Sequence, residues 1–96
     1  MDRKYKILVV DDDPQELILI GAILRAHNYD MVSINDSRIA IDAIKKEAPD
    51  LILLDIMMPV VDGYTILKKI KGDDAIKNIP VIMVTALDQD GNKVIA

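Results

Sequence analysis

The sequence predicts an α/β fold in which helices cover both faces of a parallel β-sheet. Short apolar runs rich in Val, Ile and Leu recur along the chain, and a segment with helical periodicity follows each of the first three. The run at residues 51–54 is apolar without a break, which is typical of a strand buried on both faces of a parallel sheet. Strands and helices that alternate with short joins favour right-handed crossovers, and therefore a parallel sheet.

Four stretches have the composition of strands. Residues 5–10 end in two valines, which favour β structure. Residues 31–34 are more mixed in polarity, so we expect this second strand at an edge of the sheet. Residues 51–55 and 81–85 are predicted to be the third and fourth strands.

The first helix is predicted to start at Asp13 and to end before residues 27–30. Asp13 is a suitable N-cap, Pro14 suits the first helical position, and Glu16 completes a capping-box pattern. The apolar surface of this helix is wider than contact with one sheet requires, so either a second element or a partner is expected to cover part of it. Its large apolar residues are Leu17, Ile18, Leu19, Ile20, Ile23 and Leu24.

Two further helices are predicted from the residues that can cap and end them. The stretch Asn35-Asp36-Ser37 supplies the N-cap of the second helix, which Pro49 closes. Asp62 and Gly63 cap the third helix, which Gly72 ends. The lysines of both helices are expected to face water, although a lysine cluster can also mark a partner surface. The residues predicted to face inward are Ile39, Ala40, Ala43 and Ile44 in the second helix and Ile66, Leu67 and Ile70 in the third.

The bulk composition limits the classes of function. A chain of 96 residues that is 51% hydrophobic and 29% charged is expected to form one small packed domain. The net charge of −4 argues against direct binding of nucleic acid. The absence of cysteine excludes disulfides and thiolate metal sites, and fits a cytoplasmic location. No apolar run is long enough for a signal peptide or a membrane span, so no membrane partner is expected.

Carboxylates follow two of the predicted strands at the point where each strand ends. Asp11, Asp12 and Asp13 follow the first strand, and Asp55 ends the third. Taken alone, Asp55 could simply cap a turn. If the two strands are parallel and adjacent, however, Asp11, Asp12 and Asp55 converge at one edge and repel one another. A divalent cation would remove that conflict, and hard carboxylate oxygens without His or Cys favour Mg²⁺, or Mn²⁺, over zinc.

Such a site can hold a phosphoryl donor against a carboxylate. Asp55 is the better candidate nucleophile, because its strand is the more central and it stands alone. The main-chain carbonyl of Met57 is a candidate metal ligand, and the hydroxyl of Thr85 could bond a phosphoryl oxygen. Thr85 could equally be an ordinary β-branched strand residue.

Together these residues resemble the receiver domain of two-component response regulators, with matching spacing along all 96 residues. The resemblance implies a flavodoxin-like, doubly wound sheet of order 2-1-3-4-5 and a phosphoryl group accepted from a sensor histidine kinase or phosphotransfer protein. The motifs that carry the resemblance are Val9-Val10-Asp11-Asp12, Leu54-Asp55-Ile56-Met57-Met58-Pro59, Asp62-Gly63 and Val84-Thr85-Ala86.

The resemblance also implies a role for each site residue. Asp55 would be the phosphoacceptor; Asp12, Asp55 and the Met57 carbonyl would hold Mg²⁺; and Asp11 would assist through water. Thr85 would be the switch hydroxyl that moves toward the phosphoryl group. The protein would then not be an enzyme, apart from self-catalysed phosphotransfer and autodephosphorylation.

The sequence departs from the family pattern in two places. Val60 and Val61 stand where the family commonly has glycine and methionine before Asp-Gly. The family's fourth helix, fifth strand and fifth helix are also missing, although Asp88 is a weak candidate helix start. No lysine after Thr85 matches the family lysine that pairs with the phosphoryl group, because Lys93 would fall in the expected fourth helix. We therefore expect residues 1–96 to be a C-terminally incomplete receiver with sheet order 2-1-3-4.

Incompleteness has predicted consequences. The apolar strand at residues 81–84 would be an unpaired edge, which favours a homodimer, strand exchange or marginal stability. Leu19 and Ile23 are the residues of the first helix that we expect to be uncovered. Mg²⁺ binding should survive, whereas phosphotransfer should be impaired without the family lysine.

Two alternatives stay open from the sequence. A haloacid dehalogenase-type phosphohydrolase also uses an aspartate nucleophile and Mg²⁺, but Pro14 stands where its motif needs Thr or Val and the chain is short. The other is a receiver-like module that binds partners without being phosphorylated.

Overall fold

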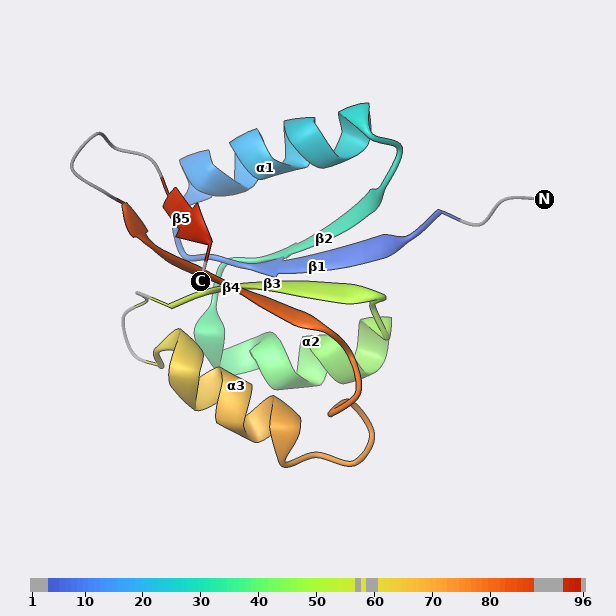
Figure 1. The fold of residues 1–96 in the computed structure, drawn as a ribbon, viewed down its shortest axis with the longest axis vertical. Helices are drawn as coiled ribbons and strands as arrows, with labels where there is room; N and C mark the ends of the chain where they lie inside the picture. Colours follow the sequence, from blue (N-terminus) through green and yellow to red (C-terminus); the bar gives the residue numbers. More distant parts are fainter. Residues whose placement is uncertain (1–3, 57, 59–60, 88–92, 96) are drawn as a thin grey trace.

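The computed structural model describes residues 4–56, 58, 61–87 and 93–95, of which residues 85–87 and 93–95 are described by their main chain alone. It confirms the predicted α/β fold (Figure 1). The sheet has the order β2-β1-β3-β4-β5, and its first four strands are parallel, as predicted. The strands are β1 (Lys6–Val10), β2 (Asp30–Ile34), β3 (Leu51–Asp55), β4 (Val81–Leu87) and β5 (Lys93–Ile95).

The first and third helices begin where their capping aspartates predict. The carboxylate of Asp13 accepts a hydrogen bond from the main chain of Gln15, and that of Asp62 accepts one from Thr65. Asp36 caps a short 3₁₀ turn, η1, which precedes the second α-helix and was not predicted. The helical segments are α1 (Pro14–Ala26), η1 (Ser37–Ile39), α2 (Ala40–Glu47) and α3 (Gly63–Lys71).

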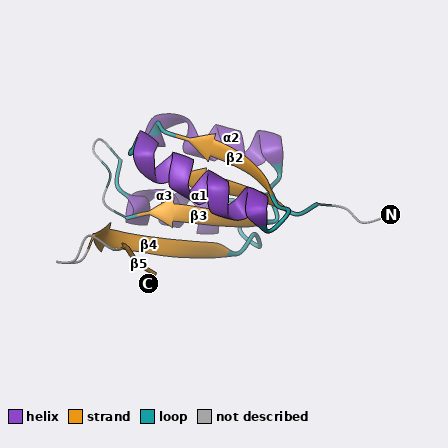
Figure 2. Ribbon diagram, turned by 90° about the horizontal axis from the view of Figure 1, so that it is seen from above, coloured by secondary structure: helices purple, strands orange, loops and turns teal. Residues whose placement is uncertain are grey.

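The helices lie in two layers on opposite faces of the sheet. In Figures 1 and 2, α2 and α3 lie on one face and α1 lies on the other. Ile52 and Leu54 of β3 are buried, whereas the alternate residues Leu51 and Leu53 are only half-buried. The main core therefore lies between the sheet and the α2–α3 layer. Its buried residues are Leu8, Val10, Ile34, Ala40, Ile44, Ile52, Leu54, Met58, Ile66, Ile70 and Ile76.

On the other face, α1 leaves apolar surface uncovered. A groove of about 570 Å³ lies here, and its lining includes Leu24 of α1 and Leu53 of β3. Leu19 is 61% exposed and Ile23 is 51% exposed, as predicted, and Ile18 is exposed as well. The apolar surface of α1 is wider than its contact with the sheet, so part of it stays exposed to solvent.

The prediction that Ile39 faces inward on the second helix is wrong. Ile39 is 50% exposed, whereas Ala40 and Ile44 are fully buried. The reason is that Ile39 is the last residue of η1, and a 3₁₀ turn has a different period from the α-helix that follows.

The predicted unpaired edge and the helical position of Lys93 are also wrong. Residues 93–95 form β5, which pairs antiparallel with β4 through Val84–Ile95 and Leu87–Lys93. The physical reason is that a strand edge presents unsatisfied main-chain groups, which the chain's own last strand can pair with. Residues 81–83 have no β5 partner among the described pairs, so the predicted edge is reduced to this part of β4. The possible helix start at Asp88 lies outside the described residues.

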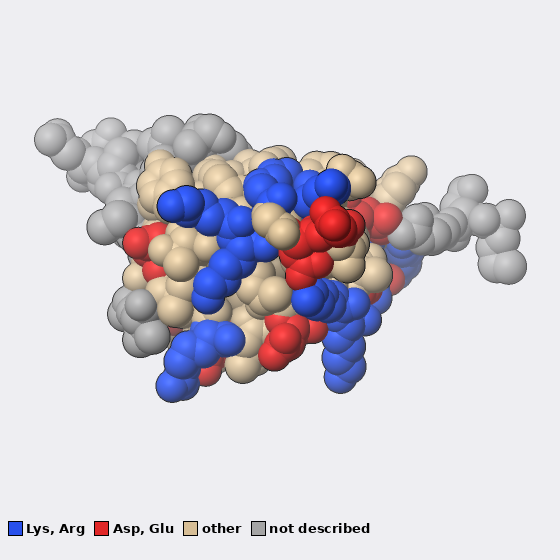
Figure 3. Space-filling model, turned by 90° about the horizontal axis from the view of Figure 1, so that it is seen from below, with Lys and Arg blue, Asp and Glu red and all other residues tan. Residues whose placement is uncertain are grey.

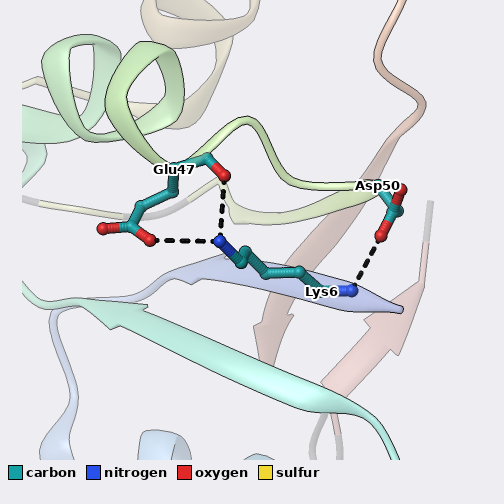
Figure 4. A network of polar contacts seen from close by, with 3 residues as sticks. All are labelled: Lys6, Glu47 and Asp50. Carbon is teal, nitrogen blue, oxygen red and sulfur yellow. Dashed lines mark hydrogen bonds and ion pairs between the residues drawn. The ribbon is translucent and has the colours of Figure 1, made fainter. Parts of the chain in front are cut away.

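A polar network joins β1 to the α2–β3 connection at the amino-terminal end of the sheet (Figure 4). Lys6 Nζ donates to the main-chain oxygen of Glu47 at 3.1 Å and lies 3.4 Å from its carboxylate. The main-chain N–H of Lys6 donates to Asp50 Oδ2 at 2.8 Å. These contacts fix β1 against the start of β3. They therefore support the register of the two strands, which decides which residues meet at the carboxyl end of the sheet.

The outer face of α2 and α3 carries charges of both signs, which intersperse in Figure 3. Lys68, Lys69 and Lys71 are exposed there, as predicted. Lys45 Nζ lies 2.6 Å from Asp73 Oδ2 and links α2 to the turn after α3. A mixed surface of this kind is typical of a solvated face. In the described part of the chain, every helix is too short to cross a membrane.

Candidate metal centre

The pairing of β1 with β3 brings two aspartates together. Val10 pairs with Leu54 in the parallel register, so Asp11 and Asp55 are the next residues on adjacent strands at the carboxyl edge of the sheet. Asp12 follows directly. One carboxylate oxygen from each of Asp11, Asp12 and Asp55 can be chosen so that all lie within 4.8 Å of one another. The convergence predicted from the sequence is therefore present.

The members of this cluster differ in exposure. Asp11 is 2% exposed and Asp55 is 3% exposed, whereas Asp12 is exposed to solvent. Burial of two neighbouring carboxylates is costly unless positive charge or hydrogen bonds compensate it. The exposed Asp12 leaves the cluster open to an ion that arrives from solvent.

Main-chain hydrogen bonds hold Asp11 in place. Its N–H donates to the carbonyl oxygen of Ile34 at 3.0 Å, which extends the pairing of β1 with β2 by one residue. Its Oδ1 accepts a hydrogen bond from the main-chain N–H of Asp13, also at 3.0 Å. Asp13 itself lies outside the cluster and caps α1, as predicted.

Asp55 lies in the centre of the sheet, between β1 and β4. It pairs with Val84 of β4, and the next residue, Ile56, donates its N–H to the Val84 oxygen at 2.9 Å. Ile56 in turn accepts a hydrogen bond at 3.0 Å from the N–H of Gly63, the first residue of α3. The carboxylate thus projects from a main chain that is fixed on both sides.

The start of α3 adds an ionised carboxylate near this edge. The hydrogen bond from the main-chain N–H of Thr65 is the largest contribution that holds the pKa of Asp62 below its ordinary value. Asp62 is committed to this cap and is not a member of the acidic cluster.

The donor set fits a hard divalent cation. All three groups of the described cluster are carboxylates, with no histidine or cysteine among them. Mg²⁺ prefers oxygen ligands, usually binds one or two carboxylates and keeps several waters, which an anionic ligand can replace. Mn²⁺ fits the same donors, whereas zinc would favour nitrogen or sulfur.

Two predicted site residues are not tested by the structure. Met57 lies outside the described residues. Thr85 lies in β4, one position after Val84, the register partner of Asp55, but its side chain is not described. The roles of the Met57 carbonyl and the Thr85 hydroxyl therefore stay predictions.

One contact of the site was missed by sequence reasoning. The sequence pattern predicts only that Asp62 and Gly63 cap a helix, but Gly63 also packs directly on the main chain of Asp55 and Ile56. The sequence did contain one sign of this close contact, a glycine at the first helical position. No left-handed backbone angle requires glycine there, so close packing is the remaining reason for it.

The comparisons with known proteins agree on one family. The model of the response regulator receiver domain matches residues 7–96. The response regulator PleD of Caulobacter vibrioides is 40% identical over 89 residues, which are 93% of this chain and 20% of PleD. The protein PilH of Pseudomonas aeruginosa is 34% identical over 89 residues, covering 93% of this chain and 74% of PilH. The chain thus spans only about one fifth of the length of PleD.

Solved structures give the same result. The N-terminal domain of a response regulator receiver protein from Methanoculleus marisnigri has a TM-score of 0.81 and 36% identity, covering 91% of this chain and 72% of that one. The BeF₃-activated N-terminal receiver domain of RstA from Klebsiella pneumoniae has a TM-score of 0.78 and 40% identity, covering 88% and 70%. The chain therefore belongs to the response regulator receiver domain family of two-component signalling.

Proposed function

We propose that this receiver accepts a phosphoryl group on Asp55 in a Mg²⁺-dependent reaction and thereby switches an output. The observation that carries the proposal is the buried Asp55 carboxylate, with oxygens of Asp11 and Asp12 within 4.8 Å of it. The donor would be a phosphohistidine of a sensor histidine kinase or of a phosphotransfer protein, as is usual for receiver domains. The family match favours this function over phosphohydrolase activity.

The acidic cluster and the loop after β3 would hold the metal ion. Asp12, Asp55 and the main-chain carbonyl of Met57 are the proposed ligands, and Asp11 acts through a bound water. When bound, Mg²⁺ would neutralise negative charge on the phosphoryl oxygens. Asp12 is exposed and can therefore bind an ion that arrives from solvent, whereas Asp11 is buried and oriented by the Asp13 N–H.

The chemical step is a direct transfer. A carboxylate oxygen of Asp55 attacks the phosphorus of the phosphohistidine, an O–P bond forms and the P–N bond breaks. The imidazole leaves with the electron pair of that bond and takes up a proton, and the product is an acyl phosphate on Asp55. This reaction transfers one group to the protein itself, so we expect no turnover of a separate substrate.

Thr85 is the proposed switch residue. It follows the register partner of Asp55 on the neighbouring strand, which supports a hydroxyl at the same edge of the sheet. We propose that, after phosphorylation, this hydroxyl moves toward the phosphoryl group and donates a hydrogen bond to one of its oxygens.

Acetyl phosphate tests this proposal without a kinase. The protein is incubated with acetyl phosphate and Mg²⁺ and its intact mass is measured; we expect a gain of one phosphoryl group that EDTA prevents and Asp55→Asn abolishes. Asp13→Asn is the matched control, because it removes a neighbouring acidic charge outside the cluster and asparagine caps a helix as well as aspartate. An adduct that persists in Asp55→Asn would exclude Asp55 as the phosphoacceptor.

The exposed apolar face of α1 favours a second candidate, a module that binds partners without phosphorylation. Ile18 is 70% exposed, and Leu19 and Ile23 of the same helix are also exposed. A chain that binds Mg²⁺ but forms no adduct with acetyl phosphate would support this second function over the first.

A further inference from the structure

Gly63, the first residue of α3, lies against the main chain of Asp55 and Ile56 at the end of β3. A Cβ atom at Gly63 would overlap the carbonyl oxygen of Asp55, and it would lie 2.8 Å from the Cα of Ile56. Both neighbours are main-chain atoms, so no side-chain rotation can relieve the overlap. A side chain at position 63 would therefore displace either the start of α3 or the end of β3.

Hydrogen bonds continue this contact into the sheet. The N–H of Gly63 donates to the carbonyl oxygen of Ile56 at 3.0 Å, and the N–H of Ile56 donates to Val84 of β4 at 2.9 Å. Gly63 is buried, and the adjacent Asp62 is held by its cap with Thr65. The first turn of α3 is thus docked on the main chain that carries the Asp55 carboxylate.

The other described glycines do not meet such a constraint. A Cβ at Gly21 would lie 3.1 Å from the sulfur of Met31, which is the end of a flexible side chain. A Cβ at Gly72 would lie 3.3 Å from the carbonyl oxygen of Lys68. Gly63 also lies within an α-helix and needs no left-handed backbone conformation, so close packing is the reason for glycine here.

We propose that Gly63 is a positioning residue for the metal centre, an inference that rests on the proposed function of the cluster. The absence of a side chain lets α3 dock on Asp55 and holds its carboxylate within reach of Asp11 and Asp12. Alanine at this position separates the carboxylates from their common centre. Because groups that orient metal ligands typically contribute roughly 10- to 100-fold to affinity, Gly63→Ala weakens Mg²⁺ binding by that factor.

Calorimetric titration with Mg²⁺ tests the proposal. The wild-type protein, Gly63→Ala and two controls are compared at a temperature where circular dichroism shows each to be folded. Gly21→Ala controls for adding a methyl group at a buried helical glycine, and Ile44→Val for lost stability in the core away from the site. We expect the dissociation constant to rise only in Gly63→Ala. An unchanged constant in that variant overturns the proposal.

A measurement on the wild-type protein covers the case in which Gly63→Ala does not fold. During Mg²⁺ titration followed by NMR, we expect the amide signal of Gly63 to shift with the same dissociation constant as that of Asp55. The amide of Gly72, at the other end of α3, should not shift. If the Gly63 amide signal does not shift while that of Asp55 does, the positioning role alone is overturned. If the wild-type protein binds no Mg²⁺, the proposed function and this inference are overturned together.

Discussion

Asp11 and Asp55 are buried side by side, each one position beyond the Val10–Leu54 pair of two parallel strands. Together with Asp12, they offer carboxylate oxygens within 4.8 Å of one another. Negative charges at this spacing in a poorly solvated place repel one another, and a bound cation converts that repulsion into attraction. The stability of the fold should therefore depend on the metal and on each charge in the cluster.

Mg²⁺ should stabilise the folded protein. At a free concentration one hundred times the dissociation constant, the free energy of unfolding should rise by about 2.7 kcal/mol, because the ion binds only the folded chain. Urea denaturation followed by circular dichroism, with and without Mg²⁺, measures this change. Asp13→Asn should keep the effect, and a wild-type protein that is indifferent to Mg²⁺ would contradict the assignment of the cluster as a metal centre.

Without metal, Asp55→Asn should be more stable than the wild type. The substitution removes one of the crowded charges and keeps the shape of the side chain, so we expect a gain of about 1 kcal/mol or more in the free energy of unfolding. The same variant should lose most of its stabilisation by Mg²⁺. Parallel urea titrations in EDTA provide the comparison, and a metal-free Asp55→Asn that is less stable than wild type would count against repulsion in the cluster.

Asp62 should make stability depend on pH in the acid range. The hydrogen bond from the Thr65 N–H holds the pKa of Asp62 in the folded protein below its ordinary value of 3.8. Its stabilising contribution is fully present above that ordinary value and is lost as the pH falls through the lowered pKa of the folded state. Asp62→Asn keeps a capping oxygen without the charge, so its unfolding free energy should fall less steeply on acidification. Equal slopes for the two proteins would refute this contribution.

Two isoleucines close together in sequence should respond differently to truncation. Ile44 is fully buried, so Ile44→Ala should lower the free energy of unfolding by about 2–5 kcal/mol. Ile39 is 50% exposed at the end of η1, so Ile39→Ala should lower it by less than about 1 kcal/mol. Thermal and urea denaturation of both variants test the correction that the structure makes to the predicted inward stripe.

Much of the site could be predicted because it depends on short stretches of sequence. Asp11 and Asp55 each follow an apolar run, and parallel strands bring such positions to one edge of the sheet. Residues 93–95 could not be placed in the same way, since their pairing with β4 joins segments whose own patterns do not specify a partner. The contact of Gly63 with Asp55 likewise depends on how closely a helix approaches a strand.

The sequence by itself determined the order along the chain of the first four strands and the three α-helices, and it identified Asp13 and Asp62 as helix caps, because periodicity and helix capping act between near neighbours. It also identified the candidate acidic cluster, because each of its aspartates follows or ends an apolar run. Only the tertiary structure decided that Ile39 faces solvent, that β5 pairs with β4 and that Gly63 packs on the main chain of Asp55. The pairing of β5 with β4 and the contact of Gly63 with Asp55 arise between segments that are distant in sequence, where local preferences do not specify the partner. The exposure of Ile39 arises because the second helical segment begins with a 3₁₀ turn, whose period differs from that of an α-helix.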